Sequence, residues 1–233
     1  TARAWYMLRT LNPRTLVWDG PDADYTPFSD DLPWCMVPEK KITVEDIKYV
    51  LSSHYQGTPY DPYASYGDKS MCGAYRSIGI NRNDDMALIQ MRQEGETLQW
   101  LALASNAFNV LAPFYTGIDR TPEYLSGTTG KVSTENFYWI SRMIAAMADA
   151  SYNKSVFHIE RYQEKVAAKS HEILNRYDAL LAQETEEDER KKLQEEANEK
   201  IAGMLQETAS DTLDKVLYEL SGQMKNAYAR SDA

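Results

Sequence analysis

The sequence YRSIGINRNDDMALIQMR (Tyr75–Arg92), followed by WLALASNAFNVLAPFYTG (Trp100–Gly117), contains the patterns that decide the fold class. Two apolar runs, Tyr75–Ile80 and Met86–Met91, are joined by NRNDD, which is typical turn chemistry, so we expect a β-hairpin. A third apolar run, Trp100–Ala104, predicts a third strand. Strands of this kind indicate a sheet covered by helices and not a helical bundle.

Proline divides the chain into two parts. All 9 prolines lie at or before Pro122, and the glycines that follow are Gly127, Gly130, Gly203 and Gly222. Proline interrupts helices and glycine weakens them. The distribution therefore predicts an α+β chain, with a strand-bearing part at residues 1–130 and a part with long antiparallel helices at residues 131–233.

Local patterns predict the elements of the first part. The opening ARAWYMLRTLNP predicts a short helix, and residues 19–38, rich in Asp and Pro, predict extended loops. A further helix is predicted at Thr43–Tyr55, because Thr43 and Asp46 have the spacing of a capping box.

Helical periodicity continues through the second part. Apolar spacing predicts helices at Asn136–Ala150 and from about Ser155 to Gln183. The acidic turn ETEEDE follows, where Thr185 and Asp188 again have capping-box spacing. Two more helices are predicted after it, with apolar positions at Leu193, Ala197, Ile201 and Leu205 in the first and at Leu213, Val216, Leu217, Leu220 and Met224 in the second.

Charge and composition exclude several functions. The formal net charge is -10, and we find no basic stripe of the kind that nucleic-acid binding needs. No stretch approaches about 18 uncharged apolar residues, so we expect no membrane span. No secretory signal is visible, which slightly favours the cytoplasm but leaves the compartment open if the protein's own N-terminus lies further upstream.

The residue types that usually carry hydrolytic chemistry are few. Cys35 and Cys72 lack a His at metal-ligand spacing, so we expect two unpaired thiols and no zinc site. None of the three His residues is placed to form a recognisable triad. Thr1 could act as a nucleophile with its own amine as base. Such a residue normally begins a strand, whereas the residues after Thr1 read as helical or irregular, so a Thr1-dependent amidohydrolase is the least favoured alternative.

Four blocks occur in an order that resembles a known family. They are R-x-W at Arg3 and Trp5, the passage from Thr43 to Tyr63, YRSIGINR at residues 75–82, and SNAFNVLAPFYTG at residues 105–117. Over about residues 1–150 they resemble the later portion of cysteine dipeptidases that use an N-terminal nucleophile, a family related to penicillin V acylase and bile-salt hydrolase.

The resemblance implies a fold and a reaction. It implies a four-layer αββα sandwich, to which residues 1–130 would contribute before the helical region. It also implies a cysteine exposed at the chain start by autoproteolysis, whose thiolate attacks a peptide carbonyl while its own α-amine acts as base. The substrates would be small peptides, mainly dipeptides, and no metal or organic cofactor would be needed.

The sequence departs from the family pattern because it does not begin with Cys. An internal thiol such as Cys35 or Cys72 has no α-amine beside it to serve as base. We therefore interpret the chain as the C-terminal portion of a dipeptidase, inactive alone. Its expected partners are the N-terminal part of the same protein, a dipeptide substrate and, through apolar surface left on the helical hairpin, further copies of itself.

Three residues are candidates for the complete active site. The resemblance implies a late arginine near the nucleophile, and Arg76 in YRSIGI is the best match; there it would lower the thiol pKa or hold charge beside the substrate. A strand-end salt bridge is the alternative role of Arg76. Asp61 and Tyr63, in TPYDPY, are candidates for lining the peptide groove or, alternatively, for fixing a turn.

A second interpretation belongs to a different functional class. Residues 155–228 are acidic and helical, and they could form a non-catalytic module that assembles partners. The state of association in solution separates this interpretation in part, because a monomer would argue against it.

Overall fold

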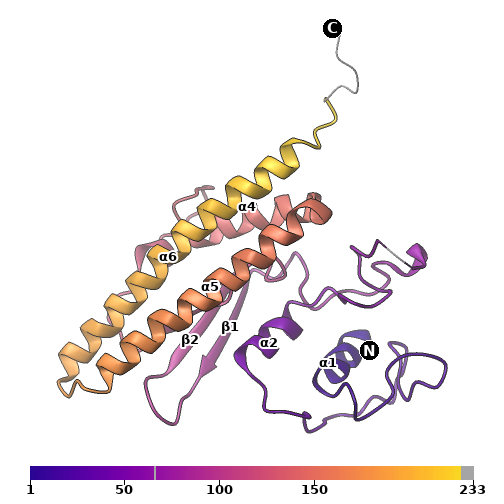
Figure 1. The fold of residues 1–233 in the computed structure, drawn as a ribbon, viewed down its shortest axis with the longest axis horizontal. Coiled ribbons are helices and arrows are strands. Elements are labelled where there is room, and N and C mark those ends of the chain that lie inside the picture. The colour runs from indigo at the N-terminus through magenta and orange to yellow at the C-terminus, as the bar shows by residue number, and fades with distance from the viewer. Residues whose placement is uncertain (66, 227–233) are drawn as a thin grey trace. The chain divides into compact units, whose positions relative to one another are not determined.

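The computed structural model describes residues 1–65 and 67–226 (Figure 1). Contacts divide the chain into two compact units, Thr1–Ile80 and a second unit that begins at Asn81. The predicted boundary near residue 130 does not coincide with this division. Strands and helices after Asn81 pack on one another, so the last proline marks a change of secondary structure inside one unit.

The first unit holds two short helices and long loops around an aromatic core. Helix α1 is Ala2–Leu11, helix α2 is Val44–Leu51, and η1, Lys69–Met71, is a single 3-10 turn. The predicted opening helix and the loops at residues 19–38 are confirmed. The fully buried or nearly buried residues of the core are Ala2, Trp5, Tyr6, Trp18 and Tyr55.

The start of α2 follows the sequence pattern. Thr43 Oγ1 accepts the Asp46 N–H at 3.1 Å, and Asp46 Oδ2 accepts the Thr43 N–H at 3.0 Å. The predicted capping box is therefore confirmed. The helix ends at Leu51, four residues before the predicted end at Tyr55, because the chain turns at Ser52 and Ser53 to receive the segment that contains Gly79.

The second unit contains a three-stranded antiparallel sheet. Strands β1 (Asp85–Gln90), β2 (Leu98–Leu103) and β3 (Ala112–Tyr115) lie in the order β1-β2-β3. Leu88 pairs with Trp100 in the first ladder, and Pro113 pairs with Trp100 in the second. The predicted strands at residues 86–91 and 100–104 are confirmed with small shifts, but they pair with each other.

The predicted strand at Tyr75–Ile80 is wrong. The Gly79 N–H donates to the Ser53 carbonyl at 2.8 Å, and a Cβ on Gly79 would lie 2.4 Å from the Ser52 carbonyl oxygen. This close docking onto the loop after α2 holds the segment in an irregular conformation.

Helices cover one face of the sheet. Helix α3 is Glu123–Ser126, α4 is Phe137–Ala150, α5 is Tyr152–Leu181 and α6 is Glu187–Ser221. Figure 1 shows α5 and α6 running side by side as a long antiparallel hairpin, and both helices pack against β3. The predicted helices at residues 136–150 and 155–183 are confirmed, and Asn136 caps α4 by accepting the Trp139 N–H at 3.0 Å.

Two details of the C-terminal prediction are wrong. The predicted pair of helices after residue 190 is one helix, α6, since no proline interrupts it and the Thr208 and Thr212 hydroxyls bond to carbonyls one turn back. The predicted Thr185–Asp188 capping box is absent from α6. Instead, Glu184 Oε1 accepts the N–H groups of Thr185 and Glu186.

The C-terminal end and the character of the helices complete the description of the fold. Residues 227–233, which the predictions included in the helical part, lie outside the described residues. Among the helices that the structure describes, none combines the length and apolar character needed to cross a bilayer.

Candidate functional site

The loop after α2 is held in a strained conformation by buried contacts. Tyr55 is fully buried and has a φ of 67°, which is unusual for a residue other than glycine. Its N–H donates to Ser53 Oγ at 2.9 Å, and its O–H donates to the Arg76 carbonyl at 2.9 Å. Such conformations cost on the order of 1–3 kcal/mol and persist only where the surroundings fix them. The loop is therefore built to hold a defined shape.

Aromatic rings pack around Tyr55 and support this loop. The rings of Tyr60 and Tyr75 lie 4.9 Å apart, those of Tyr6 and Tyr55 lie 5.5 Å apart, and all pack edge to face. Burial raises the pKa of Tyr55 to about 12 and raises the pKa of Tyr75 as well. These phenols stay protonated near neutral pH, so they act as scaffold and not as acids or bases.

His54, Asp61 and Tyr63 form a polar cluster on the same loop. His54 Nδ1 lies 2.9 Å from Asp61 Oδ1, and the two side chains are 14% and 12% exposed. The same Oδ1 accepts the Tyr63 N–H at 2.9 Å. The ring of His54 meets the ring of Tyr63 edge to face at 5.1 Å. The structure thus brings Asp61 and Tyr63 together with a histidine that the sequence analysis set aside.

The cluster has the geometry of an oriented imidazole. When the neutral His54 ring donates from Nδ1 to Asp61, the lone pair resides on Nε2. Asp61 therefore serves two purposes, fixing the turn through Tyr63 and fixing the ring of His54. A signal in the sequence could have revealed this pairing, since Gly57 and Pro59 lie between the two residues and favour a turn that brings them together.

Arg76 makes no hydrogen bond with this cluster among the residues that the structure describes. Its carbonyl accepts the Tyr55 hydroxyl, whereas its side chain is exposed. Within residues 1–65 and 67–226, no ion pair of Arg76 is found, and its segment is not a strand. Because residues 75–80 do not form a strand, Arg76 does not lie at a strand end.

The remaining nucleophile candidates are Cys35, Cys72 and Thr1. Cys35 is exposed, Cys72 is half-buried, and both thiols are free. Thr1 directly precedes helix α1, and its carbonyl accepts the Trp5 N–H at 3.0 Å. A Thr nucleophile pinned at the start of a strand is therefore not what the structure shows. Among the residues described, no group of three or more His, Cys, Asp or Glu side chains could hold a metal ion.

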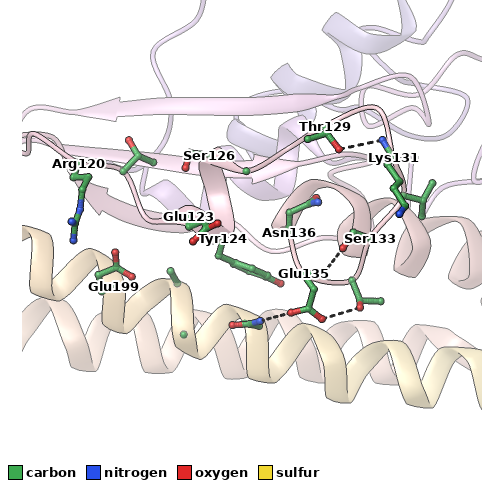
Figure 2. Close-up of a pocket in the computed structure, with 17 residues that line it drawn as sticks. Arg120, Glu123, Tyr124, Ser126, Thr129, Lys131, Ser133, Glu135, Asn136 and Glu199 are labelled. Carbon is green, nitrogen blue, oxygen red and sulfur yellow. Dashed lines mark hydrogen bonds between the residues drawn. The ribbon is translucent and has the colours of Figure 1, made fainter.

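The second unit contains a polar cavity of about 1240 Å³ (Figure 2). Its walls come from the α3 region, the loop before α4 and helix α6. Arg120 and Lys131 bring positive charge, whereas the carboxylates come from Glu123, Glu135 and Glu199. Hydrogen bonds shape the loop, such as that from Gln206 Nε2 to Glu135 Oε2 at 3.3 Å. Its lining includes no Cys or His, so it offers neither a thiol nor an imidazole.

The chain is similar to known proteins along its whole length. The sequence pattern of peptidase family C69 matches residues 1–165. A dipeptidase of Bifidobacterium longum (strain NCC 2705) is 43% identical, with 100% of this chain and 51% of that protein covered. A probable dipeptidase A of Streptococcus pyogenes serotype M18 (strain MGAS8232) is 42% identical, with 100% and 47% covered.

A more distant relative gives the same match. Dipeptidase A of Lactobacillus helveticus is 33% identical, with 95% of this chain and 44% of that protein covered. The chain thus spans about half the length of the curated relatives it matches. Because the family pattern covers well over half of the chain, the chain belongs to peptidase family C69.

Proposed function

We propose that this chain is the C-terminal portion of a dipeptidase whose nucleophile is an N-terminal cysteine carried by the upstream half. One observation carries the proposal: relatives named as dipeptidases match the whole chain but are about twice as long. Thiol attack on the peptide carbonyl and hydrolysis of the resulting acyl-enzyme would take place in the complete protein.

The αββα sandwich is proposed on the same basis. One face of the sheet packs on helices, as the ring contact of Trp100 with His171 of α5 at 5.8 Å illustrates. The opposite face carries the apolar side chains of Ala87, Ile89, Leu101 and Leu103, which are exposed or half-buried. A second sheet from the complete protein would bury this face and give two sheets between two helical layers.

The first unit would supply the substrate side of the active site. We propose that the exposed Arg76 guanidinium lies near the missing thiolate, where its charge would lower the thiol pKa. Tyr63 would form part of the wall of the peptide groove. Asp61 would act by holding His54 and Tyr63 in place, because both of its observed contacts are already made within the loop.

The mature start of the full-length protein tests the proposal. Intact mass and N-terminal sequencing of the purified parent protein should place a cysteine at its first residue. Alkylation of that cysteine with iodoacetamide should abolish dipeptide hydrolysis while leaving Cys35 and Cys72 to react without consequence. Full activity after complete alkylation of the first residue would remove the proposal.

An assembly role is the second candidate. Helices α5 and α6 leave large apolar side chains exposed, namely Phe157, Leu180, Leu217 and Tyr218. We propose that these residues support association of copies of the protein. Light scattering after size exclusion should show an oligomer, and the double variant F157S/Y218S should shift it toward monomer. A wild-type monomer would exclude this role.

A further inference from the structure

The two edges of the sheet differ in whether they can accept another strand. Tyr115 of β3 donates its N–H to Asn198 Oδ1 at 2.8 Å and accepts from Asn198 Nδ2 at 3.0 Å. Both backbone groups of Tyr115 therefore point away from β2. Backbone direction alternates along a strand, so Pro113 also faces this edge, and proline has no N–H to offer. The edge of β3 is closed by a helix side chain and by a proline.

The edge of β1 has no such protection. The Ala104 N–H donates to the Asp84 carbonyl at 2.7 Å, which fixes the alternation along the β1–β2 ladder. By that alternation, Asp85, Ala87 and Ile89 direct their N–H and C=O groups away from β2. Within residues 81–226, these outward groups make no hydrogen bond, and all three residues are exposed, Ile89 to 62%.

The composition of β1 also favours pairing. The strand reads DMALIQ, and its only charged side chain is Asp85 at the first position. Proteins usually protect a free edge with Lys, Pro or a bulge, and β1 has neither of these residues. An unprotected edge of six residues, four of them apolar, opposite an edge closed at Tyr115 and Pro113, is expected where a further strand belongs.

We propose that β1 receives a fourth strand from the other half of the parent protein, so that the sheet continues past β1 and not past β3. The occupant follows from length, since the relatives contain about as much chain again as the part that matches here. This inference rests on the proposed function, because it assigns the strand to the half that would carry the nucleophile. The outward groups of Asp85, Ala87 and Ile89 would then join the two halves through backbone hydrogen bonds.

Amide hydrogen exchange in the full-length protein tests the inference. The N–H groups of Asp85, Ala87 and Ile89 should exchange at least about 100-fold more slowly than those of an unstructured peptide, at every protein concentration. Exchange at unstructured rates would overturn the inference. Protection that appears only as protein concentration rises would also overturn it, since a second copy would then cover the edge.

Hydrogen exchange in a proline variant provides a second test of whether a strand pairs with the edge of β1. Ala87→Pro in the full-length protein removes one outward N–H but none of the β1–β2 hydrogen bonds. With a fourth strand present, Asp85 and Ile89 should exchange about 100-fold faster than in the wild type, whereas the control Ala87→Ser should change exchange less than about twofold. Equal exchange in both variants would refute the added strand, and if Ala87→Pro does not fold, the wild-type measurement decides.

The assay also separates this inference from the proposed function. Dipeptide hydrolysis is measured on the same wild-type sample. Protected amides without hydrolysis would reject the dipeptidase proposal and leave the fourth strand in place. Hydrolysis with unprotected amides would reject the fourth strand alone.

Discussion

Arg92 and Asp178, which lie 86 positions apart in sequence, form an ion pair with two bonds: Nη1 donates to Oδ2 at 2.6 Å and Nη2 donates to Oδ1 at 2.9 Å. Tyr115 donates its hydroxyl to the same Oδ1 at 2.8 Å. One carboxylate on α5 thus joins the loop of the β1–β2 hairpin to β3. The hydrogen bond to Asp178 is also the largest cause of the raised pKa of Arg92.

Removal of this carboxylate should destabilise the protein. Asp178→Ala leaves the Arg92 guanidinium and the Tyr115 hydroxyl without their acceptor, at an expected cost of about 2–4 kcal/mol. The control is Asp211→Ala, which breaks an exposed pair with Lys215 and should cost less than about 1 kcal/mol. Urea unfolding of both variants measures the difference, and equal losses would show that the Arg92–Asp178 pair holds nothing together.

Asn198 should be as important as an apolar core residue. Asn198→Leu leaves the N–H and C=O of Tyr115 buried without partners, at an expected cost of about 2–5 kcal/mol in the free energy of unfolding. Gln206→Leu changes an exposed amide on the same helix and should stay within about 0.5 kcal/mol. If the two variants unfold at the same urea concentration, α6 does not close the edge of β3 in the way described.

Lys48 predicts a pH dependence of stability. Its Nζ donates to Ser52 Oγ at 2.7 Å, and burial lowers its pKa to about 7. The unfolded chain, with an ordinary lysine pKa, then binds more protons than the folded chain between about pH 7 and pH 10. Stability should therefore rise with pH in this window, by up to about 1.4 kcal/mol per pH unit, and be lowest below pH 7.

The variant Lys48→Met isolates this effect. Urea unfolding at several pH values between 7 and 10 should give a flatter profile for Lys48→Met than for the wild type. Lys41→Met, at an exposed position, is the control and should keep the wild-type profile. Parallel profiles for the wild type and Lys48→Met would mean that Lys48 keeps an ordinary pKa in the folded protein.

Arg76 should matter for activity more than for stability. Because its side chain is exposed, Arg76→Ala should change the free energy of unfolding by less than about 0.5 kcal/mol. In the full-length enzyme the same change should lower kcat/KM for a dipeptide by about 10–100-fold, the loss of one charged contact. Arg82→Ala is a matched exposed control, and unchanged kcat and KM for Arg76→Ala would end its proposed role.

Local patterns in the sequence predicted local structure well. The capping box of Thr43 and Asp46 and the helix that starts after Asn136 depend on residues three positions apart, so the sequence contains all the information they need. The long helix α5 follows in the same way from its periodicity. These elements depend on interactions between residues close in sequence, so contacts with distant segments are not needed to predict them.

Contacts between distant residues explain what the sequence did not reveal. Tyr75–Ile80 has an apolar pattern, but its backbone bonds to the Ser53 carbonyl and not to a strand. Strand β3, Ala112–Tyr115, was not predicted, because all four residues are buried and no alternation marks it. Pairing of His54 with Asp61 was missed because it depends on how the turn between them closes.

Dipeptide hydrolysis by the 233-residue chain alone, compared with that of the full-length protein at equal molar concentration, tests the central claim most directly. The account predicts turnover by the full-length protein and none by this chain, since the proposed nucleophile belongs to the upstream half. Turnover by the purified chain alone, at a rate comparable with that of the full-length protein, would contradict it.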